Sequence, residues 1–325
     1  MSTPFENGIF ALMFDRILIL LKGGDPGPMT EGEWMSLLWE AHNQRVMGLV
    51  ADAVAALPED AKPPVGIRMK LALELDTIEK RNVQVNSAAA ELTRRFSEEG
   101  LHPLIQKGPS VAALYDNPLH RECGDIDLFF PGDEFRRSRA VVERLAADSA
   151  GASVSVPCDE SDGAFYYKFN GVTVEHHPRY YDSAYQFPEL ETGSPESVLA
   201  MLSAHILKHA LGRGIGLKQI CDYFVARGRL TFDRALFDSV MRKAGLSRWQ
   251  QLLDSFGPDL RTIVARDGNF GRRTVAIPSG KQALNPAGRI TKGGTAMAFA
   301  KKLPFALKYA PKEWLHTVLS LIFSR

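Results

Sequence analysis

The chain has 325 residues, which at roughly 150 residues per domain predicts about two domains. Hydrophobic residues make up 45% and charged residues 24%, and a chain of this length buries a full core without disulfides or a structural metal. The net charge of +1 excludes a simple polyanion binder that uses its whole surface. The charge is uneven, because residues 268–325 hold ten Lys/Arg and one acid, Glu313, so that this segment carries about +9 and the remainder about −8.

The cysteines and the N-terminal residues favour a soluble, cytoplasmic protein. No CxxC pair is present, which excludes a zinc ribbon, and the odd number of thiols speaks against a disulfide framework. No basic segment precedes the apolar stretch Ile9 to Leu21, which Asp15 and Arg16 interrupt, so neither a signal peptide nor a membrane span is expected. The three cysteines are Cys123, Cys158 and Cys221.

Residues 1–100 form a predicted N-terminal helical region. Apolar residues recur at helical spacing from Ile9 to Leu20, and a second helix follows Thr30, with acidic residues in its first turn. A long helix without proline is predicted from Ile67 to Glu99, with Gly100 as its C-terminal cap.

Residues 101–192 form a predicted α/β core, in which short predicted strands alternate with helices. The dipeptide Asn170-Gly171 predicts a hairpin between the last two strands. Helices are expected after the turn Lys107 to Ser110, continuing through Tyr115, and from Asp133 to Leu145. The predicted strands are His102–Gln106, Asp125–Phe130, Ala152–Val156, Ala164–Phe169 and Val172–His177.

Helices return in residues 193–266, beginning at Ser194-Pro195-Glu196 and again near Lys218. Residues 267–325 are predicted to be a basic connector and a C-terminal helical tail. The tail mixes lysines with large apolar residues; we expect it to pack on the acidic body of the protein, with binding to an anionic membrane or to nucleic acid as the alternatives.

Asp125 and Asp127 are the most informative residues of the predicted core. Side chains alternate along a strand, so these two carboxylates share one face while Ile126 points to the other. Two carboxylates on one face repel each other unless a cation lies between them, and Mg²⁺ prefers carboxylate and phosphate oxygens. A solvated edge strand that merely carries acids is the alternative.

Two other segments strengthen the first interpretation. The turn Lys107 to Ser110 leaves a strand and enters a helix, where Gly108 permits a close approach of the backbone to phosphate. On the strand Val172 to His177, Glu175 shares a polar face with His177, so it can supply a third acid beside the first two.

The order of these motifs resembles that of the nucleotidyltransferase superfamily. The motifs are Lys107-Gly108, Arg121, the segment Gly124-Asp125-Ile126-Asp127-Leu128, and a later strand with an acid followed by a histidine. The sequence of these motifs is similar to that of a bacterial group called uncharacterised nucleotidyltransferases. The resemblance is strong from Pro103 to His177 and continues more weakly into the helix Met201 to Leu211 and the helix that contains Asp222. It implies an α+β fold: a small mixed sheet with flanking helices, embedded between N- and C-terminal helical regions.

The resemblance also implies a metal-dependent transferase. Asp125, Asp127 and Glu175 are then the catalytic residues and hold Mg²⁺ or Mn²⁺ on a nucleoside triphosphate, with ATP the expected donor; Glu175 is either a metal ligand or the general base. Gly108 and Ser110 are then nucleotide-binding residues that face the phosphates. The acceptor is implied to be a hydroxyl or phosphate of unknown identity.

Other polar residues are weaker candidates. Lys107 and Arg121 either neutralise bound phosphates or form ion pairs with the acids themselves, and Glu175 could instead pair with Arg121 or Arg179. His205 and His209 lie four residues apart, a spacing that suits either zinc binding or helix packing. Substrate contacts are conceivable for His177, His209 and Lys218.

Two further functions remain open from the sequence. The same metal site could bind the diphosphate of a nucleotide-sugar donor. A different class is a non-catalytic nucleotide-binding or antitoxin-like interaction protein. Three acids within reach of one shared metal position favour the enzyme, whereas a site with Glu175 turned away favours the binding protein. Base preference and oligomeric state are not predicted.

Overall fold

The computed structural model describes residues 4–147, 153–159, 163–211, 214–267 and 302–316, and it divides into two compact units, residues 1–180 and 181–325. The four predicted segments are finer than these units, and their boundaries stay a prediction. In the described part of the chain, no helix is both long and apolar enough to cross a membrane.

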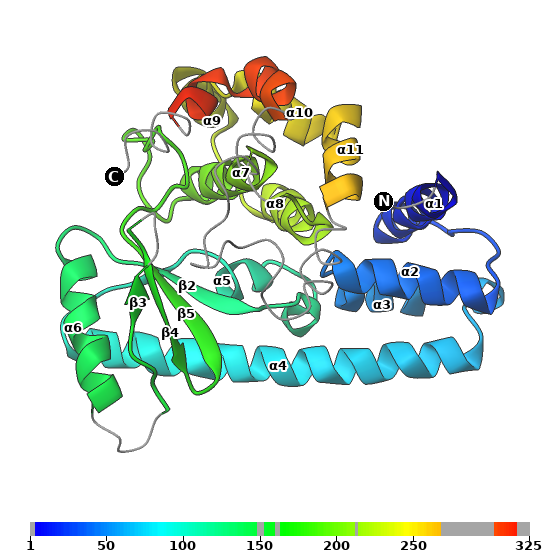
Figure 1. Cartoon of the computed structure of the whole chain (residues 1–325), viewed down its shortest axis with the longest axis horizontal. Helices are drawn as coiled ribbons and strands as arrows, with labels where there is room; N and C mark the ends of the chain where they lie inside the picture. Colours follow the sequence, from blue (N-terminus) through cyan, green and yellow to red (C-terminus); the bar gives the residue numbers. More distant parts are fainter. Residues whose placement is uncertain (1–3, 148–152, 160–162, 212–213, 268–301, 317–325) are drawn as a thin grey trace, which may run out of the picture. The chain divides into compact units, whose positions relative to one another are not determined.

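Helices open the first unit, much as the sequence predicts (Figure 1). The helix α2 starts with a capping box, in which the Thr30 hydroxyl accepts from the Glu33 amide and the Glu33 carboxylate accepts from the Thr30 amide. The long helix α4 ends as expected, with Gly100 in a left-handed conformation just beyond it. The elements are α1 (Pro4–Leu21), α2 (Glu31–Asn43), α3 (Met47–Ala55), η1 (Glu59–Ala61) and α4 (Val65–Glu98).

A five-stranded mixed sheet follows in the order β1-β2-β5-β4-β3. The β2–β5 pair is parallel, and the other pairs are antiparallel, so the predicted small mixed sheet with flanking helices is confirmed. The elements are β1 (Leu104–Ile105), α5 (Pro109–Ala112), η2 (Pro118–His120), β2 (Asp125–Phe129), α6 (Glu134–Ala147), β3 (Cys158–Asp159), β4 (Phe165–Phe169) and β5 (Val172–His177).

Three predicted elements differ from the structure. Of the segment Ala152–Val156, the described residues form only an isolated bridge, between Val154 and Phe169, and the third strand is Cys158–Asp159 instead. The first strand has two residues rather than five. The helix after the turn ends at Ala112, before an extended backbone at Asn117 that Pro118 favours.

One face of the sheet carries the hydrophobic core of this unit. Ile126 and Leu128 of β2, Val174 of β5, and Tyr167 of β4 are all at most 1% exposed. They pack in one cluster with apolar residues of α4 and α6, and α4 contacts both β2 and β5 (Figure 1). Since strand side chains alternate, the intervening residues of β2 and β5 point to the opposite face.

The second unit is helical and has its own buried side chains, including Tyr223, Phe237 and Trp249. Helical residues 302–309 and 311–316 belong to this unit, whereas most of the predicted connector lies outside the described residues. The elements are α7 (Pro195–Leu211), α8 (Leu217–Arg229), α9 (Arg234–Ala244), α10 (Ser247–Ser255) and α11 (Pro258–Asp267).

Candidate metal centre

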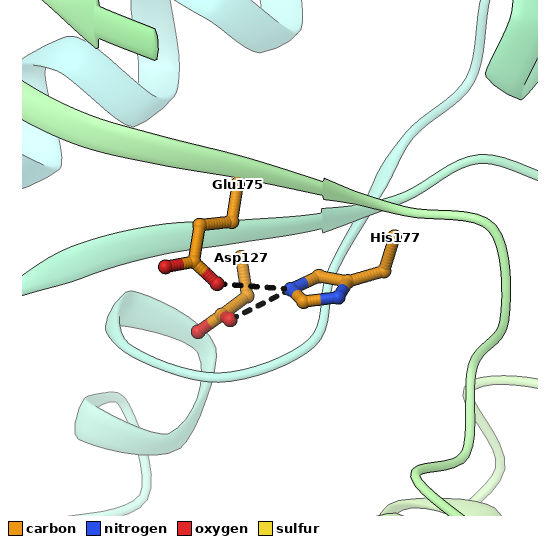
Figure 2. Close-up of side chains that lie close together, drawn as sticks. All are labelled: Asp127, Glu175 and His177. Carbon is orange, nitrogen blue, oxygen red and sulfur yellow. Dashed lines mark hydrogen bonds and ion pairs between the residues drawn. The ribbon is translucent and has the colours of Figure 1, made fainter. Parts of the chain in front are cut away.

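Two neighbouring parallel strands bring the acidic residues together. In the register of β2 with β5, Asp127 is the partner of Glu175 and Phe129 is the partner of His177. Parallel partners point to the same side of a sheet, so Asp127, Glu175 and His177 all project from the face opposite the core. Figure 2 shows the three side chains converging from the two strands. The expectation that the Glu175 strand neighbours the aspartate strand is therefore confirmed.

Their ligand atoms lie close enough to share a cation. His177 Nε2 lies 2.9 Å from Asp127 Oδ1 and 3.6 Å from Glu175 Oε2, and one ligand atom from each residue lies within 4.8 Å of the other two (Figure 2). In the described part of the chain, this is the one cluster of three such residues found. The Asp127 side chain is 8% exposed and the Glu175 side chain 30%, so the cluster is held mostly away from water.

Glu175 is directed toward Asp127 rather than toward an arginine. Among the described residues, the ion partner of Glu175 is His177, and neither Arg121 nor Arg179 pairs with it. The predicted alternative of a Glu175–arginine pair is therefore wrong. The reason is the strand register, which places Glu175 beside Asp127.

Electrostatics confirm how crowded this face is. Burial and the neighbouring charges of Asp127 and Asp125 raise the pKa of Glu175 from its ordinary value of 4.5 to about 7. The positive charges of His177 and Lys107 act in the opposite direction but do not cancel this effect. A divalent cation at this position would remove the repulsion that raises the pKa of Glu175.

Asp125 lies on the same strand face, two residues before Asp127. It is half-buried, belongs to the field that acts on Glu175, and lies outside the tight group formed by Asp127, Glu175 and His177. The close group therefore consists of two acids and a histidine, whereas the sequence pattern favours three acids. The signal for His177 was its position two residues after Glu175 on the same strand.

Lys107 reaches this cluster from the turn after β1. Its Nζ lies 3.0 Å from Asp127 Oδ1, and its side chain is only 13% exposed. The preceding residue fixes the turn, because the Gln106 amide donates to the Asp127 carbonyl at 3.0 Å and Gln106 Nε2 donates to the Tyr180 carbonyl at 2.7 Å. Of the two roles predicted for Lys107, phosphate binding and an ion pair with one of the acids, the structure has the ion pair, with Asp127.

The backbone conformation and close packing at position 108 require glycine. Its backbone has φ +66° and ψ −117°, and a Cβ at this position would stand 3.0 Å from the Asp125 carbonyl oxygen. The turn thus lies directly against the start of β2. Ser110 follows on α5 and is exposed, with its hydroxyl donating to the Lys107 carbonyl at 3.4 Å.

Arg121 lies before β2, and its side chain is buried. The guanidinium Nη1 donates to the Glu122 carbonyl at 3.3 Å and lies 3.2 Å from Cys123 Sγ. Asn82 of α4 binds the Arg121 carbonyl at 2.9 Å. These contacts anchor the segment that enters β2, and a nucleotide-binding role for Arg121 stays a prediction.

His209 and Lys218 lie on α7 and α8 of the second unit. The rings of His205 and His209 are 4.5 Å apart, and His205 Nδ1 lies 2.9 Å from Asp182 Oδ2. Lys208 Nζ binds the same carboxylate at 2.8 Å. The histidine pair is thus tied into a hydrogen-bonded network, and the substrate contacts expected of His209 and Lys218 stay predictions.

The comparison with protein families decides the class of protein. A family model described as uncharacterised nucleotidyltransferase matches residues 30–253, more than half of the chain. The chain belongs to this nucleotidyltransferase family. Membership indicates a transferase of nucleotidyl groups, and the matched range includes the whole sheet with Asp127, Glu175 and His177. Neither a curated protein nor a solved structure matches the chain significantly.

Proposed function

We propose that this nucleotidyltransferase moves a nucleoside monophosphate from a nucleoside triphosphate to a hydroxyl or phosphate of an acceptor, with Mg²⁺ held by Asp125, Asp127 and Glu175. The observation that carries the proposal is the convergence of Asp127, Glu175 and His177 from two parallel strands. Two of the three predicted acids, Asp127 and Glu175, lie at this position with His177, and Glu175 is not turned away from it as expected of a protein that only binds nucleotide.

The chemistry of the donor set fits a divalent cation. Carboxylate oxygens are the ligands that Mg²⁺ prefers, and an imidazole nitrogen also suits Mn²⁺. Lys107 Nζ and His177 Nε2 both lie about one hydrogen bond from the same oxygen, Asp127 Oδ1, which shows that this oxygen attracts positive charge. The raised pKa of Glu175 indicates the same demand for a cation at the second carboxylate.

The protein's own residues would then divide the work. A metal ion held there would neutralise charge on the phosphate oxygens of the donor. Lys107 adds a further positive charge beside the acids, and Gly108 lets its turn lie directly against the start of β2, next to those acids. Glu175 would either complete the set of metal ligands or take the proton of an acceptor hydroxyl, because it lies beside Asp127 on the neighbouring strand.

A thermal-shift screen tests this proposal. Nucleoside triphosphates and nucleotide sugars are added with and without Mg²⁺, and pyrophosphate release is measured for each ligand that stabilises the protein. We expect stabilisation by at least one nucleoside triphosphate that requires Mg²⁺ and disappears in Asp127→Asn. Asp76→Asn is the matched control, because Asp76 is an exposed acid of α4 that pairs with Lys80.

The other outcomes separate the alternatives. Stabilisation by nucleotide sugars alone would replace the triphosphate donor by a sugar nucleotide. Stabilisation without any pyrophosphate release would indicate a binding protein. If Asp127→Asn responds to Mg-nucleotide as the wild-type protein does, the assignment of the site is wrong.

A further inference from the structure

In the helical residues 302–316 of the second unit, a pair of exposed side chains recurs every four residues. Buried or half-buried positions alternate with exposed pairs along both short helices. One of the exposed rows is apolar and the adjacent row is mainly basic. The apolar row consists of Leu303, Leu307, Pro311 and Leu315, and the adjacent row of Pro304, Lys308, Lys312 and His316.

The inner face of these helices is held on the second unit. Ala306 and Ala310 are fully buried, and Phe305 packs edge-to-face on Trp249 with ring centroids 6.3 Å apart. Lys302 Nζ donates to the Ala210 carbonyl at 2.7 Å. Because these contacts fix the helices, the outer face has a defined orientation toward solvent.

The outer face combines exposed leucine with lysine and lacks exposed acids of its own. Leu303, Leu307 and Leu315 are 38%, 57% and 59% exposed. The single acid among residues 302–316 is Glu313, which is 7% exposed and accepts from the Ser183 hydroxyl and the Ala184 amide. Solvating three leucines on one fixed face is costly, so this face suits an apolar partner.

The charge of this part of the sequence favours an anionic partner. Residues 268–325 contain ten Lys/Arg, and their one acid is the buried Glu313. From the neighbouring helix α11, Asp259 binds Lys308 Nζ at 2.9 Å and the Tyr309 hydroxyl at 2.7 Å, so this contact offsets the charge of Lys308, and Lys312 is the other lysine of the outer rows. A partner that satisfies both rows therefore offers an apolar interior beneath negative charge.

We propose that the outer face of residues 302–316 docks on the surface of an anionic phospholipid bilayer. Leucine side chains enter the boundary between headgroups and acyl chains, while the adjacent Lys312 pairs with lipid phosphate or carboxylate groups. Single-stranded nucleic acid fits less well, since it stacks its bases on exposed aromatic rings, and the outer rows offer leucine and proline instead. The proposal does not depend on the nucleotidyltransferase reaction.

Co-sedimentation of the full chain with vesicles tests this surface. The two vesicle types are phosphatidylcholine alone and phosphatidylcholine mixed with phosphatidylserine. We expect binding to the mixed vesicles that weakens with salt. The combined substitution Leu303→Ser, Leu307→Ser, Leu315→Ser should reduce binding on the order of tenfold or more, because the inserted apolar surface is lost.

The matched control is a second exposed apolar row, on α4. Val65, Met69 and Leu73 are 61%, 64% and 68% exposed at the same spacing of four residues. The combined substitution Val65→Ser, Met69→Ser, Leu73→Ser removes comparable apolar surface and should leave vesicle binding unchanged. Lys312→Glu, which keeps all leucines, should also weaken binding, whereas Lys80→Glu on α4 should not.

Several results would overturn the proposal. It is wrong if the wild-type protein ignores the mixed vesicles or binds pure phosphatidylcholine equally well. It is also wrong if the leucine variant or Lys312→Glu binds as the wild-type protein does, or if the α4 control loses binding to the same extent. Binding to single-stranded RNA without binding to vesicles would replace the lipid by a nucleic acid.

Discussion

His176 and His177 are consecutive residues of β5 with opposite environments. His176 is fully buried on the core face, where its ring nitrogens lie 2.9 Å from the Ser138 hydroxyl and 3.1 Å from the Tyr167 hydroxyl. His177 lies on the other face, within reach of two carboxylates. Strand alternation alone separates a core histidine from one at the candidate metal centre, so neighbouring residues of one strand can have different roles.

The buried environment of His176 also determines the charge of its ring. Burial, reinforced by the nearby His177, lowers the pKa of His176 well below its ordinary range, so this ring is neutral. Aromatic rings of Phe130 and Phe165 pack on it at centroid distances of 4.6 and 4.5 Å. His177 instead faces the carboxyl groups of Asp127 and Glu175, close enough to share a cation with them. One face of the sheet thus carries the hydrophobic core, and the other carries the cluster that we propose to be the metal centre.

The largest expected effect is on the chemical face. Asp127→Asn should reduce nucleotidyl transfer by roughly a thousandfold or more, because an oxygen ligand loses its charge, with little loss of fold stability. Pyrophosphate release and a thermal melt measure the two quantities. Asp76→Asn should leave both nearly unchanged, and a transfer rate for Asp127→Asn equal to that of Asp76→Asn would contradict the site.

Glu175→Gln distinguishes a base from a ligand. If Glu175 acts as the base, transfer should fall by about a hundredfold to ten-thousandfold while Mg-nucleotide affinity stays near the wild-type value. If Glu175 is chiefly a ligand, affinity and rate should fall together. Rate and affinity are measured on the same preparation, and a wild-type rate would remove Glu175 from both roles.

The adjacent histidines give the sharpest form of the comparison. His176→Ala should cost about 2–4 kcal/mol of folding stability, since it opens a cavity and removes the ring that hydrogen-bonds the Tyr167 and Ser138 hydroxyls, of which Ser138 keeps its bond to the Phe135 carbonyl. His177→Ala should cost little stability but should weaken divalent-cation binding by roughly 10–100-fold. Denaturant melts and cation titrations on both variants measure this, and an exchange of the two outcomes would mean that the faces are assigned wrongly.

The pH dependence of stability carries the signature of Glu175. Its folded-state pKa of about 7 lies above its ordinary value of 4.5, so the folded state keeps a proton that the unfolded state has released between these values. Without a divalent cation, stability should therefore fall as pH rises from about 4.5 to 7. Glu175→Gln should be more stable than wild type by up to about 3 kcal/mol above pH 7, and equally stable below 4.5.

The smallest effect is expected at Gly108, which supports the chemical face from outside. Gly108→Ala should destabilise the protein by about 1–2 kcal/mol, because φ is positive and the new Cβ meets the Asp125 carbonyl. Gly132→Ala is the control, since its φ of +57° is similar but nothing lies within 4 Å of its Cβ. An equal cost for both would show that the close approach to β2 contributes nothing.

The alternation of side chains along the predicted strands made much of the site predictable from the sequence. Asp125, Asp127 and Glu175 could be placed on one face from the spacing of their neighbours, and the Asn170-Gly171 hairpin followed from its turn residues. The weak edge strand β3 could not, because a two-residue strand is decided by pairing with Tyr166 and Phe165 rather than by its own pattern.

Long-range contacts were the other limit. The ion pair of Lys107 with Asp127 spans twenty residues and depends on how Gln106 is anchored at Asp127 and Tyr180. The buried position of Arg121 depends on Asn82 of α4, far away in the sequence. Neither partner is signalled by periodicity, so the sequence left two roles open for each of these cations.

Direct counting of bound Mn²⁺ tests the central claim most closely. The free ion has a measurable electron paramagnetic resonance signal, so binding can be titrated with and without nucleoside triphosphate. The account predicts saturable Mn²⁺ binding by the wild-type protein and Asp76→Asn, strengthened by nucleotide and lost in Asp127→Asn. Equal Mn²⁺ binding by Asp127→Asn and Asp76→Asn would show that the cluster of Asp127, Glu175 and His177 is not the metal centre.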